Sequence, residues 1–131
     1  MKYALPVLSN QYLQIKQKLT LLANLKEDWN GDGADIPGKQ TFFNAERFIS
    51  GLPIDVFKNI KEEDINLTPY GTVVLDFQNL KKDFISVEIG KEKIGFFTEF
   101  ISGPNYRSEG IKIGIDEIPR EIVPAFKGLM A

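Results

Sequence analysis

The stretch "FISVEIGKEKIGFFTEFI" at residues 84–101 decides the fold. Apolar and polar side chains alternate on both sides of the segment GKEK, which is typical of two half-buried β-strands joined by a short turn. A four-residue turn that links Ile89 to Ile94 places Val87 opposite Phe96. The apolar residues of both strands then share one face, and a slip of one residue would turn one set to the wrong side.

Further segments extend this hairpin into a sheet. Strand patterns occupy residues 65–69, 72–78 and 110–115. Pairing Phe77 with Ile85 keeps the apolar sets on one face if the linking loop has an odd length, most simply residues 80–82. The segment 65–69 contains a proline, so we expect it at an edge of the sheet. Successive strands with short links usually pair with their neighbours, which predicts a meander of four or five antiparallel strands.

Two amphipathic helices are expected before the strands. Residues 8–28 repeat apolar side chains at helical spacing, and Ser9 or Asn10 can cap this helix. A second helix covers residues 39–51, with Asp35 as its predicted N-cap. Each helix has one apolar face, which must pack against another element.

These elements predict one α+β domain over residues 1–131. The helices and the sheet each have one apolar face. The economical packing therefore places the two N-terminal helices on one face of the antiparallel meander. The last sixteen residues contain Pro119 and Pro124, so we expect only short helical turns there.

The composition excludes several classes of function. The chain has no cysteine and no histidine, which removes thiol chemistry, the usual proton carrier near neutral pH and the commonest metal ligand. A net charge of −2 gives no electrostatic reason to expect nucleic acid. No stretch approaches the ~20 apolar residues of a membrane span, and the N-terminus is a poor signal peptide. We expect a cytoplasmic, non-enzymatic protein without a cofactor.

The segment "DWNGDGADIPG" at residues 28–38 allows two interpretations. Asp28, Asn30 and Asp32 stand at the spacing of the first three ligands of a calcium-binding EF-hand loop, followed by Gly33. Lys39, however, stands where that loop has its bidentate glutamate, at the twelfth position. Calcium binding at these three residues is therefore the less favoured interpretation.

The alternative is a structural corner. Gly31 and Gly33 allow a positive φ without steric cost, and Asp28 and Asn30 can accept hydrogen bonds from free backbone amides. Trp29 is the only tryptophan in the chain. We expect its ring to be buried between the helices and the sheet, where it would lock the turn.

This corner also carries a resemblance. Trp29 to Ala34, with Pro37 behind them and Ala45 and Phe48 in the following helix, resemble small uncharacterised bacterial proteins that share the motif W-[DN]-G-x-G-A after a first helix. A later strand motif of that set is matched by Gly71, Val73, Leu75 and Phe77. The resemblance implies no catalytic residue.

The outward face of the sheet holds more apolar residues than a solvated face needs. Four of them have no assigned core: Val74, Phe84, Phe97 and Ile101. An antiparallel sheet with one wet face should be mainly polar there, and a contiguous apolar patch often marks a protein interface. Alternatively, the C-terminal segment, with Ile118, Ile122, Val123 and Phe126, folds over this face. Both alternatives remain open at this point.

The same face places two carboxylates on a diagonal. Asp76 and Glu88 could serve as acid and base in a carboxylate enzyme. Scattered acids on a solvent face are more common, and no polar cluster that could orient a substrate surrounds them. The favoured function is a small regulatory or protein-binding domain whose partner is another protein or a second copy. Calcium binding and carboxylate catalysis are the alternatives.

Overall fold

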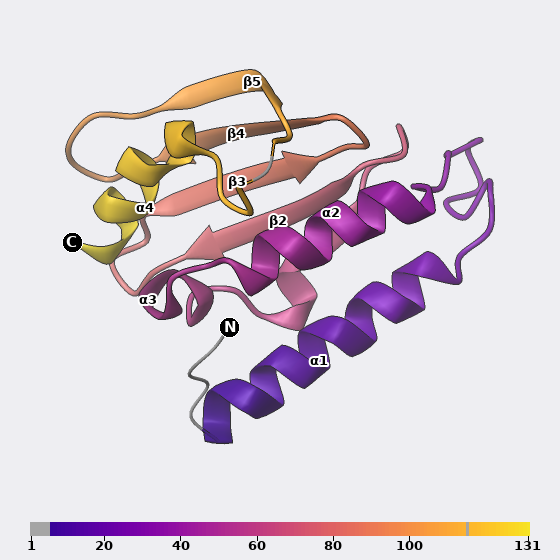
Figure 1. The fold of residues 1–131 in the computed structure, drawn as a ribbon, viewed down its shortest axis with the longest axis horizontal. Helices are drawn as coiled ribbons and strands as arrows, with labels where there is room; N and C mark the ends of the chain where they lie inside the picture. The colour runs from indigo at the N-terminus through magenta and orange to yellow at the C-terminus, as the bar shows by residue number, and fades with distance from the viewer. Residues whose placement is uncertain (1–5, 115) are drawn as a thin grey trace.

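The computed structural model of the protein describes residues 6–114 and 116–131. The long elements are, in chain order, α1 (Pro6–Ala23), α2 (Lys39–Ser50), β1 (Ile65–Leu67), β2 (Val73–Gln78), β3 (Phe84–Ile89), β4 (Lys93–Glu99), β5 (Arg107–Lys112) and α4 (Val123–Met130). A short helix, α3 (Ile54–Phe57), and two 3-10 turns, Glu62–Asp64 and Arg120–Ile122, complete the order. The predicted α+β class is confirmed (Figure 1).

The sheet has five antiparallel strands in the order β1-β2-β3-β4-β5. The predicted register is confirmed, because Val87 lies opposite Phe96 and Phe77 lies opposite Ile85. Asn79 donates its backbone N–H to Asp83, which closes the predicted three-residue loop. Lys82, the last residue of that loop, has a φ of +74°, the left-handed conformation usual for this type of hairpin.

The last strand begins three residues earlier than predicted, at Arg107 and not at residue 110. Ile94 pairs with Ile111 and Phe96 pairs with Ser108, so β5 contains one residue more than β4 between these pairs. This bulge lets a segment without apolar alternation join the ladder. The last residue of the predicted strand, 115, lies outside the described residues.

The helix ends differ from the predicted caps for local reasons. The first helix begins at Pro6, and proline is common at a first helical position, so Ser9 and Asn10 lie inside the helix. It ends at Ala23, well before residue 28. The second helix begins at the predicted residue and ends at Ser50, one residue earlier than predicted, with Gly38 as its N-cap. The predicted cap, Asp35, lies three residues before Gly38, and its backbone N–H donates to the backbone oxygen of Pro69 at 2.9 Å.

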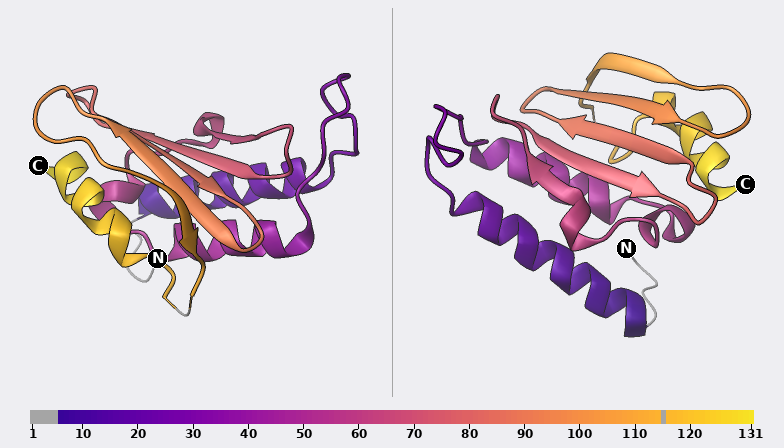
Figure 2. Two further views of the ribbon diagram at one scale, coloured as in Figure 1. Left: turned by 90° about the horizontal axis from the view of Figure 1, so that it is seen from above. Right: turned by 180° about the vertical axis from the view of Figure 1, so that it is seen from behind.

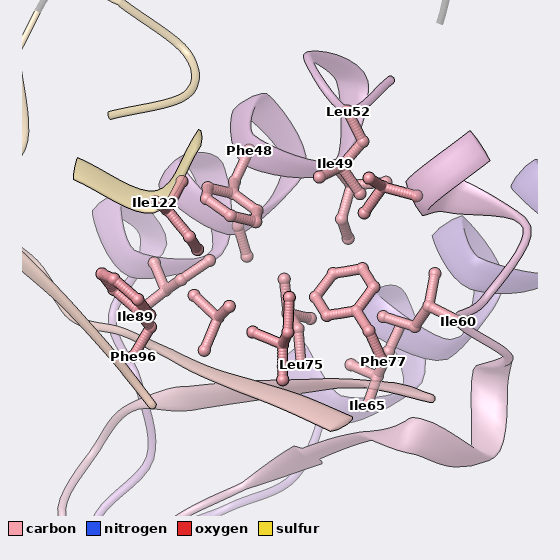
Figure 3. Packing of buried hydrophobic residues seen from close by; sticks show 14 of the residues in the cluster. Phe48, Ile49, Leu52, Ile60, Ile65, Leu75, Phe77, Ile89, Phe96 and Ile122 are labelled. Carbon is pink, nitrogen blue, oxygen red and sulfur yellow. The ribbon is translucent and has the colours of Figure 1, made fainter. Parts of the chain in front are cut away.

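The helices form a second layer with unequal roles. α2 contacts β2 and β3, whereas α1 contacts α2 and the edge strand β1. Seen from behind, the strands lie in front of α2 and α4 (Figure 2). Between the layers, helix residues such as Phe48 and strand residues such as Leu75 and Phe77 interdigitate and exclude water (Figure 3).

The C-terminal segment is more extensive than the predicted short turns. The ring of Phe126 in α4 lies 6.2 Å from that of Phe48 and 6.1 Å from that of Phe77. Ile122 and Leu129 are buried in the same core. The C-terminal helix therefore packs on the inner face of the sheet, and the alternative in which this segment covers the outer face is wrong.

Candidate functional site

The outer face of the sheet carries three of the four apolar residues predicted for it, and the fourth, Ile101, lies beyond the end of β4 at Glu99. We call Val74, Phe84, Phe97 and Ile101 the outer patch. Phe97 is 40% exposed and Ile101 is 72% exposed, while Val74 and Phe84 are half-buried. The rings of Phe84 and Phe97 lie 6.1 Å apart and tilted, which is a favourable aromatic arrangement. Ile101 continues beyond β4, where its backbone N–H donates to the carboxylate of Asp83 at 2.9 Å.

A shallow hollow of about 450 Å³ adjoins the outer patch. Val74 and Phe97 are its apolar walls, and Gly95 lies at its base. Its other lining residues are Ser86, Glu88, Phe96, Arg107, Ser108 and Glu109. We call this depression the Gly95 hollow.

The β4–β5 bulge shapes the base of the Gly95 hollow. A Cβ atom on residue 95 would lie 3.3 Å from the backbone carbonyl oxygens of both Ser108 and Glu109. This contact is tight, so glycine is what allows the two strands to approach at this point. The backbones of β4 and β5 therefore lie unusually close together beside the hollow.

The charged side chains around the hollow have few firm partners. Arg107 forms an ion pair with Glu109 at 2.9 Å, and both side chains are largely exposed. An exposed pair of this kind contributes little to stability. Glu88 accepts a hydrogen bond from the Thr72 hydroxyl at 2.7 Å. The carboxylates of Glu88 and Glu109 are therefore held on the surface and can still accept hydrogen bonds from a bound group.

Asp76 lies on the same outer face but in a different environment. Burial raises the pKa of its carboxyl above the ordinary value of 3.8; a hydrogen bond from Ser86 opposes this shift and the charge of Asp64 adds to it. Its Oδ1 atom is buried without a hydrogen-bond partner. The register places Asp76 opposite Ser86 and Glu88 opposite Val74, so the two predicted carboxylates are diagonal neighbours. Ser86 and Thr72 engage them separately, and no shared partner joins them.

The corner loop folds onto its own backbone. Asp28 accepts from the N–H of Gly33 at 2.6 Å, and Asn30 accepts from the N–H groups of Asp32 and Ala34 at 2.8 and 3.2 Å. Positive φ angles at Asp28 (+61°), Gly31 (+79°) and Gly33 (+79°) allow this closure. The side-chain oxygens of Asp28 and Asn30, two of the three proposed calcium ligands, thus already accept from loop amides. Among the residues that the structure describes, no three acidic side chains are grouped to hold a metal.

The predicted burial of Trp29 is wrong. Its side chain is half-buried and does not belong to the buried core. The loop extends beyond the ends of α1 and α2 (Figure 1), and the indole N–H donates to the backbone oxygen of Asp35 at 3.1 Å. The hydrogen bond of the indole therefore links Trp29 to Asp35 within the loop. Ala34, only 2% exposed, and Pro37 are the buried residues of this segment.

No protein-family model, curated protein or solved structure matches the chain. The resemblance of the tryptophan-glycine motif therefore stays a prediction. Within residues 6–114 and 116–131, no helix has the length and apolar character needed to cross a membrane.

The sequence analysis missed the Gly95 hollow and the β5 residues that line it. Arg107, Ser108 and Glu109 were placed outside the last strand, because "RSEGIK" has no apolar alternation. A usable signal was present, since an isolated glycine inside a strand pattern suggests a bulge or a close approach of backbone. Gly95 interrupts the strand pattern of residues 93–101 in this way.

Proposed function

We propose that this protein is a non-enzymatic regulatory domain that binds another protein through the outer patch. The proposal applies to the surface around Phe84 and Phe97, and not to the tryptophan loop, whose polar side chains bond to their own backbone. Aromatic residues are enriched among the side chains that dominate binding energy at protein interfaces. The hollow beside Phe97 adds a concave feature against which a partner can pack.

One observation carries the proposal. The C-terminal helix packs its Phe126 ring against Phe48 and Phe77 on the inner face, and Phe97 and Ile101 of the outer patch remain exposed. Exposed neighbouring apolar groups are unfavourable in water, and they are commonly found where a partner covers them.

The rest of the proposed function follows from the chemistry of the chain. The absence of cysteine and histidine and the separate engagement of Asp76 and Glu88 support a role without catalysis. The net charge of −2 favours a protein over a nucleic acid as partner. We place the protein in the cytoplasm on the same sequence grounds as before.

A pull-down from native lysate tests the proposal. Three proteins are used as bait: wild type, Phe97→Asp, and Leu80→Asp as a matched control. Leu80 is fully exposed at the β2–β3 turn and is not a residue of the outer patch, so both variants add the same charge to the surface. We expect wild type and Leu80→Asp to retain the same partner and Phe97→Asp to lose it.

The self-association version of the proposal has its own readout. Light scattering of the same three proteins reports the mass of any assembly of identical copies. A dimer that is lost only in Phe97→Asp identifies a second copy as the partner. Capture of identical proteins by all three baits, together with identical masses, contradicts the outer patch as the binding surface.

A further inference from the structure

The Gly95 hollow adds a chemical requirement to the proposed partner. Its lining includes the apolar side chains of Val74 and Phe97 and the carboxylates of Glu88 and Glu109. The one cationic lining residue, Arg107, is already paired with Glu109.

This combination fits one kind of side chain. Lysine and arginine have an apolar stem and a cationic head, and they bury the stem along apolar surface while the head finds acceptors. A stem beside Val74 and Phe97 would place its head near the carboxylates of Glu88 and Glu109. An acidic group would bring like charges together there, and a purely apolar group would cover these carboxylates without a donor, which is unfavourable.

We propose that the partner is a protein segment that inserts a lysine or arginine, flanked by apolar residues, into the Gly95 hollow. This inference rests on the proposed function of the outer patch and specifies the chemistry of its partner. The apolar residues of the partner segment cover Phe84 and Phe97, and its cation lies beside the carboxylates of Glu88 and Glu109. Charge complementarity of this kind selects the partner and its register more than it adds affinity.

A second copy of the chain fits this surface less well. A two-fold interface repeats the same patch on both subunits. The hollow of each copy is lined by the carboxylates of Glu88 and Glu109 and by one cation, Arg107, and the half-buried Asp76 lies on the same face, so two copies would bring more carboxyls than cations together. An excess of carboxylates in a desolvated interface is unfavourable. The inference therefore commits to a different, basic partner.

The test uses a displayed library of random peptides as the probe. The library is panned on the wild-type protein, and peptides that bind are synthesised and titrated by fluorescence polarisation. We expect the enriched peptides to share a lysine or arginine next to apolar residues. Amide shifts of isotope-labelled protein, above all that of Gly95, locate the bound peptide.

Three variants separate the contributions of charge and apolar surface. Phe97→Ser should weaken binding by about tenfold or more, because it removes the aromatic anchor. Glu88→Gln should weaken it roughly twofold to fivefold at low ionic strength, with a smaller difference at high ionic strength. Glutamine keeps an oxygen that can accept from Thr72. Glu46→Gln, an exposed change on α2, should bind like wild type.

The outcomes distinguish the two proposals. Enriched peptides that need Phe97 but lack a basic residue, or bind Glu88→Gln as tightly as wild type, would overturn the basic partner and leave the outer patch in place. Peptides whose binding is unaffected by Phe97→Ser, or a library that yields no peptide dependent on Phe97, would contradict the proposed function itself.

Discussion

The two faces of the sheet differ in how far their apolar side chains are covered. On the inner face, Leu75, Phe77 and Val87 are fully buried beneath α2 and α4. On the outer face of the same sheet, Phe97 of β4 is 40% exposed. Both faces carry aromatic residues, so composition alone does not decide which face is covered. The difference indicates that the inner face maintains the fold, while the apolar groups of the outer face are available for binding.

The largest expected effect comes from a matched pair of truncations on the two faces. Phe77→Ala should lower the free energy of unfolding by about 3–5 kcal/mol, because it leaves a cavity where Phe77 packs on Phe126. Phe97→Ala should lower it by less than about 1 kcal/mol, since that ring is already partly in water. Urea unfolding at one temperature measures both. Equal losses of unfolding free energy would show that Phe97 on the outer face contributes as much to stability as Phe77 on the inner face.

A buried polar contact sharpens the account of the inner layer. Asn44 of α2 donates to the backbone oxygens of Gly90 and Lys91, at 3.0 and 2.9 Å, and ties the helix to the β3–β4 turn. Asn44→Ala should cost about 1–3 kcal/mol, because it leaves these carbonyls without a donor. Gln40→Ala, which removes only an exposed donor to Asn44, should cost less. Chemical denaturation measures the stability of both variants. Equal stability of Asn44→Ala and wild type would show that the hydrogen bonds of Asn44 to the β3–β4 turn do not stabilise the fold.

Two aspartates test the outer layer by their pH dependence. Burial raises the pKa of Asp76 in the folded state above the ordinary value of 3.8. The charged carboxylate therefore lowers the stability of the folded state at neutral pH. This loss of stability is recovered as the pH falls through the folded-state pKa toward 3.8. Asp76→Asn should therefore be more stable than wild type at neutral pH, and the gain should vanish in acid. Unfolding curves measured across this pH range show the effect.

Asp83 provides the control of opposite sign. The backbone N–H of Ile101 and the side chain of Asn79 hold the pKa of Asp83 below its ordinary value. Its contribution to stability is present above the unfolded pKa and is lost as pH falls through the folded one. Asp83→Asn should then be less stable than wild type at neutral pH, and the difference should shrink in acid. Identical pH profiles for the two variants would contradict the contrast between their environments.

The smallest expected effect is the response of the corner loop to calcium. Asp28 and Asn30 already accept from loop amides, so a cation would have to compete with those hydrogen bonds. Millimolar calcium should leave both the melting temperature and Trp29 fluorescence unchanged. Magnesium at equal ionic strength is the control. A saturable shift with calcium alone would restore the metal site.

The register of the sheet was predictable because its signal is local and repeated. Alternation in residues 84–101 allows only one arrangement that buries both apolar sets, and the structure has that arrangement. The bulge opposite Gly95 depends on how two distant segments pair, and alternation does not report such pairing. The same limit concealed α4, because Pro119 and Pro124 suggested breaks although proline is tolerated in the first turn of a helix.

The face on which the candidate site lies was predictable from the sequence, whereas the surroundings of several of its residues were not. Val74, Phe84 and Phe97 followed from the face assignment of each strand, which needs only a period of two. The burial of Asp76 and the half-exposed position of Trp29 depend on which distant elements approach them. The Gly95 hollow likewise depends on the bulge, since β5 supplies three of its lining residues.

The most direct test of the central claim compares the solvent exposure of single phenylalanine rings in the free protein. A soluble paramagnetic agent is added to isotope-labelled protein, and the loss of ring signal is measured by NMR. Strong loss at Phe97, with Phe77 and Phe126 unaffected, is the predicted result. Protection of Phe97 equal to that of Phe126 would mean that another part of the chain covers the outer face, and would contradict the account.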